Sequence, residues 1–177
     1  MRFLVTGGAG YIGSHMVKYL QDRNFKVDVI DNFSTGNKWA LSNCNIFNID
    51  LLDKNALDGV LSNNNYNAVF HFAANADVRF GTDHPRRDLE QNTIATFNVL
   101  EAMRHQSIRK IAFASTGSVY GEAEVIPTPE DAPFPIQTSL YASSKLAGES
   151  LISSYCEGFD FQGWIFRFVS ILGERYT

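Results

Sequence analysis

A tyrosine and a lysine four residues apart, Tyr141 and Lys145, are spaced to do chemistry together. In a helix this spacing places the phenol and the ammonium on one face. A nearby ammonium favours the phenolate, so we expect Lys145 to lower the pKa of Tyr141. A phenol with a lowered pKa can exchange a proton with an alcohol or sugar hydroxyl near neutral pH. The same spacing is common on amphipathic surface helices, so the catalytic interpretation depends on a ligand site nearby.

Two hydroxyl side chains, Ser115 and Thr116, follow an apolar run that predicts a strand. In α/β sheets, ligands bind beyond the carboxyl ends of the strands. One of these hydroxyls could therefore hydrogen-bond a reacting oxygen. Ordinary turn chemistry also places serine and threonine after strands, and the residues alone leave both interpretations open.

A glycine-rich turn near the N-terminus predicts the ligand. Gly7, Gly10 and Gly13 stand between an apolar run at residues 2–6 and a helical pattern. A strand, a glycine-rich turn and a helix in this order form a dinucleotide-binding unit, although the spacing here is G-x-x-G-x-x-G rather than G-x-G-x-x-G. The glycines would permit a tight turn, close approach of the backbone to a diphosphate, and close packing of helix on strand.

The second strand pattern ends in an acidic residue, Asp31. A carboxylate at this point of a dinucleotide-binding unit accepts hydrogen bonds from the ribose hydroxyls of the adenosine. It would also repel the 2′-phosphate of NADP, and no arginine stands nearby in place of the acidic residue to bind that phosphate. The sequence therefore predicts NAD rather than NADP as the cofactor.

The elements that must position these residues alternate along the whole chain. This alternation predicts an α/β fold, a Rossmann-type doubly wound parallel sheet with helices on both faces. We expect strands near 2–6, 26–31, 44–49, 67–72, 109–114 and 161–168, and helices near 11–23, 53–63, 86–106 and 140–157. The proline-rich segment 121–139 predicts a long loop, which borders a substrate entrance or is only a solvated connection.

The third of these helices carries an apolar stripe. We expect the stripe to pack in the core and part of it to form a dimer face; its residues are Leu89, Ile94, Phe97, Val99, Leu100 and Met103.

Composition excludes several classes of function. The chain has 177 residues, 45% of them hydrophobic, which suits one domain with a substantial core. A net charge of −4 without a basic stripe argues against nucleic acid as a partner. No apolar segment reaches membrane-spanning length and the chain begins with a core strand, so we expect a cytoplasmic protein. The spacing of its two cysteines and four histidines predicts no metal site and two free thiols.

Taken in order, a set of motifs resembles the extended short-chain dehydrogenase/reductase family, in its NAD-dependent nucleotide-sugar epimerase and dehydratase branch. The resemblance spans essentially the whole chain and implies a hydride-transfer enzyme, UDP-glucose 4-epimerase-like. The motifs are Gly7-x-x-Gly10-x-x-Gly13, Asp31-Asn32, Asp50-Leu51, His71-Phe72-Ala73-Ala74, Ser115-Thr116 and Tyr141-x-x-x-Lys145.

The resemblance also implies roles for residues. Tyr141 would be the catalytic acid and base, Lys145 its partner, and Thr116 the hydroxyl beside the sugar oxygen that is oxidised. Asp50 and Leu51 would flank the adenine. The implied cofactor-binding residues are Gly7, Gly10, Tyr11, Ile12, Gly13, Asp31, Asn32, Asp50, Leu51, Phe72, Ala73, Ala74, Asn92, Tyr141 and Lys145.

The residues after Thr116 bear on the reaction. Dehydratases of this family have an Asp-Glu pair there, and the related decarboxylases usually keep the glutamate, whereas this chain has Gly117 and Ser118. The resemblance therefore implies inversion of C4 of a nucleotide sugar, a UDP-sugar first, through a 4-keto intermediate with NAD regenerated in each turnover. A dehydratase or decarboxylase of the same family is one alternative, and a noncatalytic NAD-binding sensor or scaffold is another.

Two departures from the family pattern qualify this interpretation. Ser170 and Glu174 stand where the family usually has asparagine and often has proline, which leaves the sugar undecided. The family also continues into a C-terminal lobe that holds the nucleotide part of the substrate. We therefore expect residues 1–177 to be an NAD-binding Rossmann domain, the N-terminal part of a longer enzyme, and this part could be inactive alone. Homodimers are common in the family, so the resemblance implies a homodimer.

Overall fold

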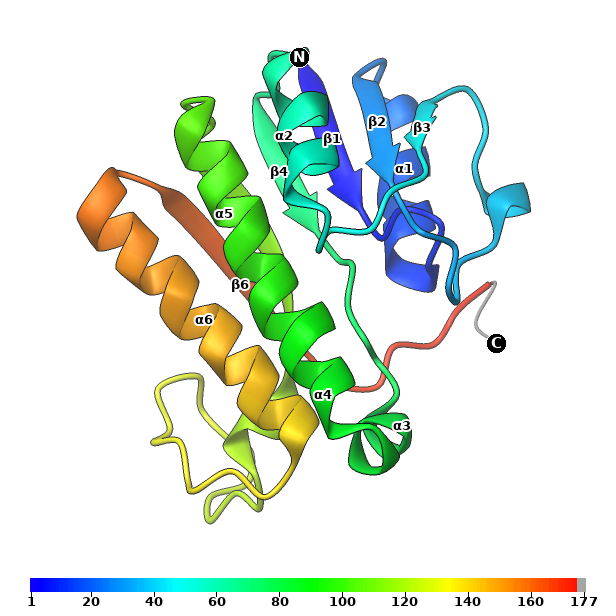
Figure 1. Ribbon diagram of the computed structural model, residues 1–177. Coiled ribbons are helices and arrows are strands. Elements are labelled where there is room, and N and C mark those ends of the chain that lie inside the picture. The colour runs from blue at the N-terminus through cyan, green and yellow to red at the C-terminus, as the bar shows by residue number, and fades with distance from the viewer. Residues whose placement is uncertain (175–177) are drawn as a thin grey trace.

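The computed structural model describes residues 1–174, and Phe80 through its main chain only. Residues 175–177 of the expected domain lie outside the described residues. Within the described part, six strands form one parallel sheet in the order β3-β2-β1-β4-β5-β6 (Figure 1). The strands are β1 (Arg2–Thr6), β2 (Lys26–Ile30), β3 (Asn45–Phe47), β4 (Ala68–His71), β5 (Lys110–Thr116) and β6 (Gln162–Phe168). This is the doubly wound α/β fold that the alternating patterns predict.

The helices connect these strands. They are α1 (Tyr11–Gln21), α2 (Lys54–Ser62), α3 (Val78–Asp83), α4 (Pro85–Asp88), a π-helical turn η2 (Leu89–Ile94), α5 (Ala95–His105) and α6 (Leu140–Phe159). Two short 3-10 turns are η1 (Lys38–Ala40) and η3 (Gly117–Tyr120). The structure contains every strand and helix that the sequence predicts. The differences are α3, which is too short to show a helical period, and the π-helical turn inside the expected 86–106 helix.

The sheet buries different side chains on its two faces because successive residues of a strand point to opposite sides. Leu4, Val69 and Ile111 face the layer formed by α2, α5 and α6. Val5 and Val29 face α1 on the other side (Figure 1). The chain order reverses at β1, which lies between β2 and β4. This point opens a crevice at the carboxyl edge, where doubly wound sheets bind their ligands.

The apolar stripe of the third expected helix divides into a buried part and an exposed part. Val99, Leu100 and Met103 are fully buried in the core, as expected. Three residues on the outer side of η2 and α5 remain exposed: Leu89 (54%), Ile94 (40%) and Phe97 (36%).

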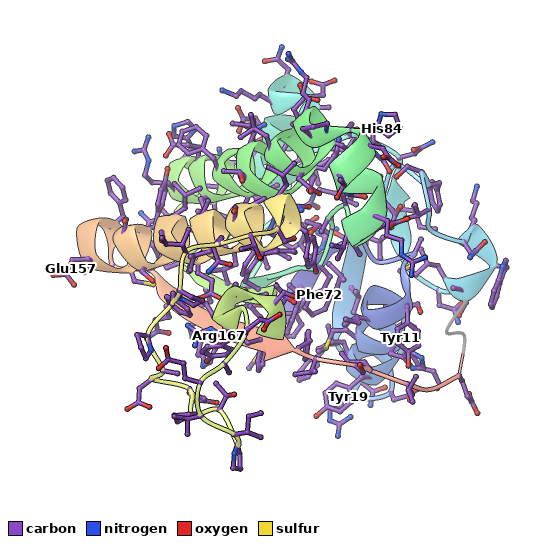
Figure 2. All side chains as sticks on the ribbon, turned by 90° about the horizontal axis from the view of Figure 1, so that it is seen from below. Tyr11, Tyr19, Phe72, His84, Glu157 and Arg167 are labelled. Atoms are coloured by element: carbon purple, nitrogen blue, oxygen red, sulfur yellow. The ribbon has the colours of Figure 1, made fainter. Side chains whose placement is uncertain are left out.

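The proline-rich segment between η3 and α6 is a loop, as expected. Arg167 at the end of β6 holds it against the sheet (Figure 2). The Arg167 guanidinium donates to the Glu130 carbonyl at 2.8 Å and lies 4.7 Å from the ring centre of Phe134. The loop is therefore anchored at the same carboxyl edge as the crevice.

Candidate functional site

The glycine-rich turn between β1 and α1 needs its glycines for backbone reasons. Gly7 has a φ of +68°, and a Cβ there would lie 2.6 Å from the Ala73 nitrogen at the end of β4. A Cβ on Gly13 would lie 2.1 Å from the Gly7 carbonyl oxygen. Gly10 precedes α1 and provides no side-chain cap, and an uncapped helix N-terminus is where a diphosphate binds.

A cavity of about 310 Å³ opens beside this turn. Most of the predicted cofactor-binding residues line it: Gly7, Gly10, Tyr11, Ile12, Gly13, Asp31, Asn32, Leu51, Phe72, Ala73 and Ala74. Figure 2 shows two of them, Tyr11 on α1 and Phe72 nearer the middle of the sheet. The sequence interpretation missed the loop after β2 and the π-helical turn, which add Ser34, Thr35, Gly36 and Gln91. These positions carry no local motif, and only the fold brings them to the cavity.

Asp31 is held in place by the main chain. One carboxylate oxygen accepts from the Ala9 amide and the other from the Phe33 amide, each at 2.8 Å. The side chain is 8% exposed and lines the cavity. Both contacts fix the direction of the carboxylate, so its remaining lone pairs point to a predictable place.

Asp50 does not line the cavity. Its Oδ2 accepts from the Asn32 amide nitrogen at 2.9 Å and from Gln91 at 3.4 Å, and both of these residues do line it. Asp50 therefore orients two side chains that line the cavity. Its expected contact with the adenine stays a prediction.

Tyr141 and Lys145 come from the first turns of α6. Ser139 caps the helix, and its hydroxyl accepts from the Ala142 amide at 3.3 Å. Lys145 is 3% exposed, donates to the Ala114 carbonyl at 2.8 Å, and lies 4.9 Å from the ring centre of Phe113. The Thr116 side chain hydrogen-bonds the Tyr141 phenol from the end of β5. The fold thus brings all three predicted catalytic residues to one site.

The expected lowering of the Tyr141 pKa is wrong for this structure. Burial of the phenol raises its pKa, and the charge of Asp88 raises it further, while the hydrogen bond from Thr116 lowers it. The Lys145 ammonium donates to the Ala114 carbonyl of β5, and its charge does not outweigh the effect of burial on the phenol pKa. Burial lowers the pKa of Lys145 itself to about 8, against the opposing charge of Asp88.

Asn92 lies in the π-helical turn, next to the catalytic pair but not on the cavity. Its oxygen accepts from the Asn75 amide at 2.7 Å, and its Nδ2 donates to the Ser144 hydroxyl at 2.9 Å. Asn92 therefore joins the segment after β4 to α6. Its expected contact with the cofactor stays a prediction.

Asp88 is a buried carboxylate that the sequence interpretation overlooked. It is 1% exposed, and its Oδ1 accepts from Asn75 Nδ2 at 2.7 Å and from Asn92 Nδ2 at 3.4 Å. A signal was present in the sequence. Asp88, Asn92 and Thr96 follow at intervals of four residues and form a polar row that continues toward the buried Val99.

His71 is a buried, neutral link between β1, β4 and α5. Burial and the charge of Lys145 lower its pKa to about 3. Its ring nitrogens lie 2.7 Å from the Thr6 hydroxyl and 2.9 Å from the Thr96 hydroxyl. Thr96 donates to the Asn92 carbonyl at 2.5 Å, so it must accept from His71 Nε2. The ring then accepts from Thr6, which in turn accepts from the Ala73 amide at 3.3 Å.

The described residues provide neither a metal centre nor a membrane-spanning helix. No group of three or more His, Cys, Asp or Glu side chains among them is placed to hold a metal ion. None of the described helices combines the length and the apolar character that crossing a bilayer requires.

Comparison with known proteins gives consistent matches over this chain. Residues 3–177 match the model of the NAD dependent epimerase/dehydratase family. A putative UDP-glucose 4-epimerase of Methanocaldococcus jannaschii is 40% identical over 175 residues, which are 97% of this chain and 56% of that protein. A UDP-glucose 4-epimerase of Halalkalibacterium halodurans is 37% identical over 98% of this chain and 52% of its own length. The chain thus spans about half the length of the curated relatives it matches.

Solved structures give the same result. The UDP-glucose 4-epimerase of Thermus thermophilus in complex with NAD matches with a TM-score of 0.90 at 37% identity, over 94% of this chain and 54% of that one. The crystal structure of another UDP-glucose 4-epimerase matches with a TM-score of 0.92 at 35% identity, over 96% of this chain and 51% of that one.

Proposed function

Because this chain belongs to the NAD dependent epimerase/dehydratase family, we propose that it is the NAD-binding part of a longer nucleotide-sugar 4-epimerase that acts on a UDP-sugar. One observation carries the proposal. Tyr141, hydrogen-bonded by Thr116 and on the same helix face as the buried Lys145, lies at the sheet edge that also bears the glycine-lined cavity. The similarity to UDP-glucose 4-epimerases over nearly all of this chain supports the same reaction.

The cavity supports NAD as the cofactor. Gly7 and Gly13 have no side chains, so the main chain next to the N-terminus of α1 leaves room for a diphosphate. The fixed carboxylate of Asp31 would accept the adenosine ribose hydroxyls and repel a 2′-phosphate. Tyr141 and Lys145 would meet the nicotinamide ribose. When bound, NAD supplies the hydride acceptor and donor of the reaction.

The side chains of this protein would move the proton and position the sugar. Tyr141 accepts the proton of the sugar O4 hydroxyl as C4 is oxidised, and it returns this proton when the 4-keto sugar is reduced on its other face. Thr116 holds O4 beside the phenol, and its hydrogen bond lowers the phenol pKa against the effect of burial. Lys145 is buried on the same helix face and would supply a positive charge to the site in which this step occurs.

The surroundings of Thr116 favour epimerisation over dehydration. Elimination of water needs an additional acid and base near the sugar. The Ser118 hydroxyl lies 3.1 Å from that of Thr116 and Gly117 has no side chain, so neither position supplies a carboxylate. Glu149 does contact Ser115, but this carboxylate is buried and paired with Arg167 at 2.9 Å. It is therefore committed to a structural ion pair and does not serve as the base.

We also propose that the sugar enters beside the proline-rich loop. An open hollow of about 890 Å³ lies between this loop and the end of β6, and Gly117, Tyr120 and Arg167 line it. It begins at the turn that follows Thr116, which supports this side as the route to the phenol.

The test of the function is a reaction in which the product identifies the chemistry. The longest natural protein that contains these residues is incubated with NAD and UDP-glucose, and the sugar ring protons are followed by NMR. We expect inversion at C4. Tyr141→Phe should abolish turnover and leave the affinity for NAD nearly unchanged, because the phenol hydroxyl takes part in the chemistry more than in binding.

Two results would contradict the proposal. Normal turnover by the Tyr141→Phe protein would remove the phenol from the mechanism. A deoxy-keto sugar as product would show that a dehydratase can work without the carboxylates that follow Thr116 in that branch.

We further propose a homodimer that forms through the exposed part of η2 and α5. Leu89, Ile94 and Phe97 are large apolar side chains that remain open on one helix surface. Phe97→Glu should shift the protein to monomers in sedimentation velocity experiments, and an unchanged sedimentation coefficient would place the interface elsewhere.

A further inference from the structure

We propose that Asp88 is a positioning residue, a buried carboxylate that keeps the Lys145 side chain in its ammonium form and thereby sets the pH range in which the Tyr141–Lys145 pair works. The inference deepens the proposed epimerase function and rests on it for its kinetic consequence. Its physical core, the coupling of one buried charge to another, can be measured without any turnover.

The geometry leaves half of the Asp88 carboxylate without a hydrogen bond. Oδ1 accepts from Asn75 and Asn92, but Oδ2 has no hydrogen-bond partner among the described residues. Gly81 closes the space next to it, since a Cβ built on Gly81 would lie 2.0 Å from Oδ2. A buried carboxylate that is only partly hydrogen-bonded is unfavourable unless a positive charge nearby stabilises it.

Lys145 is a buried positive charge, and it needs a negative charge nearby for the same reason. The residue is 3% exposed, and among the described residues its ammonium has one hydrogen-bond acceptor, the Ala114 carbonyl. The two side chains are linked through neighbouring groups. Asn92 Nδ2 donates both to Asp88 and to Ser144, and Ser144 is adjacent to Lys145 on α6. The buried carboxylate is therefore connected through Asn92 to the turn of α6 that carries the buried Lys145.

The other titratable groups around Lys145 do not offer a negative charge. His71 faces it from β4 and is neutral, with its pKa lowered to about 3. Burial raises the pKa of the Tyr141 phenol on the same helix, which disfavours a negative charge at that position. Glu149, four residues further along α6, is paired with Arg167. Among these groups, Asp88 is thus the carboxylate whose charge can stabilise the Lys145 ammonium.

The charge of Asp88 acts on both members of the catalytic pair in the same direction. It raises the pKa of Lys145 against the effect of burial, and it also raises the pKa of Tyr141. Removing it should lower both. The phenolate would then form at lower pH, and the ammonium would also be lost at lower pH. Both limbs of the pH–rate profile should therefore move toward acid together, which a general loosening of the site would not produce.

The direct test is an NMR titration of Lys145 in the protein without substrate. Protein labelled with ¹³C at lysine Cε is titrated with and without Asp88→Asn, and Lys145→Met identifies the signal. Asparagine keeps the size of the side chain and the acceptor for Asn75. We expect the Lys145 midpoint to fall by at least one pH unit in the variant. An unchanged midpoint in a folded Asp88→Asn protein would overturn the proposal.

A double variant keeps the test decisive if Asp88→Asn alone folds poorly. Lys145→Met leaves the Asp88 carboxylate buried without its counter-charge, so adding Asp88→Asn to it should raise the melting temperature. A further loss of stability in the double variant would show that Asp88 acts only through its hydrogen bonds, and this outcome would also overturn the proposal.

The kinetic consequence is tested in the active protein. With Asp88→Asn, kcat/KM should fall about tenfold on the alkaline side for each unit by which the Lys145 pKa drops, and it should rise or hold on the acid side. Failure of the epimerase assay in the unaltered protein would count against the proposed function and leave the NMR result standing. A shifted NMR midpoint with an unshifted pH–rate profile would overturn the catalytic part of the inference.

Discussion

His71 and Lys145 are two buried bases that differ in charge because their contacts differ. His71 lies between two hydroxyls that satisfy a neutral ring, one as donor and one as acceptor. Lys145 donates to a carbonyl and shares its cluster with the Asp88 carboxylate. Neutralising the histidine and keeping the lysine charged avoids two like charges in one buried place.

The neutral state of His71 predicts a pH dependence of stability. Its folded pKa of about 3 lies below the ordinary value of 6.5, so the unfolded chain binds more protons between these values. Stability from this group is present above pH 6.5 and is lost as the pH falls toward 3. Between pH 7 and pH 5 the loss should be about 2 kcal/mol.

The measurement is urea unfolding at both pH values for the unaltered protein and for His71→Gln. Glutamine cannot take up this proton, so the change in the free energy of unfolding should be about 2 kcal/mol smaller in the variant. Equal changes in the two proteins would show that the folded protein protonates His71 as readily as the unfolded chain does.

Asp31 predicts the choice between the two nicotinamide cofactors. Its carboxylate is oriented by two backbone amides and lines the cavity. Asp31→Asn removes the charge and keeps the shape, so the affinity for NAD should fall and the preference for NAD over NADP should shrink about tenfold or more. Fluorescence titration with each cofactor measures both effects. The matched control is Asp22→Asn at the exposed end of α1, which should change neither affinity.

At the scale of elements, the turn between β1 and α1 depends on close contact of main chains. Gly13 allows the start of α1 to touch the Gly7 carbonyl, and Gly7 lets the turn touch the end of β4. The helix N-terminus and the sheet edge are therefore positioned by backbone packing, and any side chain there would separate them.

Gly13→Ala should consequently destabilise the protein by about 3 kcal/mol and abolish NAD binding, because the new Cβ meets backbone that cannot move aside. The control is Gly59→Ala in α2, where a Cβ meets nothing within 4 Å. That substitution should stabilise the protein by about 0.5–1 kcal/mol. Thermal unfolding and NAD titration distinguish the two. Equal stabilities of the two variants would mean that the turn tolerates a side chain.

At the scale of the whole molecule, the two faces of the sheet are covered unequally. The helices α2, α5 and α6 cover one face, whereas α1 covers only the part of the other face near β1 and β2 (Figure 1). Trp164 and Phe166 of β6 alternate with Ile165, which packs into the core, and so they point to the less covered face. They are 49% and 45% exposed.

This aromatic surface should make the 177-residue protein bind the dye ANS and associate as its concentration rises. Changing both Trp164 and Phe166 to serine should reduce dye binding and association, as measured by fluorescence and sedimentation velocity. Trp39→Ser is the control, because Trp39 is an exposed aromatic residue in a turn away from β6. A reduction by the control as large as that by the double variant would contradict the assignment to this surface.

Local patterns along the chain are enough to predict the order of the elements and the types of residue at the site. Strands, helices and the glycine-rich turn are visible locally, because apolar periodicity and glycine spacing are properties of neighbouring residues. The motifs around Gly7, Asp31, Thr116 and Tyr141 could be read for the same reason, and the fold brings them to one edge of the sheet.

The effects of the buried charges, in contrast, depend on three-dimensional packing. The spacing of Tyr141 and Lys145 alone predicted that the lysine lowers the Tyr141 pKa. In the structure the Lys145 side chain instead points to the Ala114 carbonyl, which lies 31 residues away in the sequence. Asp88 lies far from Tyr141 in the sequence and beside it in space, and it raises the phenol pKa. Electrostatic effects depend on distance and burial in three dimensions, so packing between α4, β5 and α6 decided what no local pattern contains.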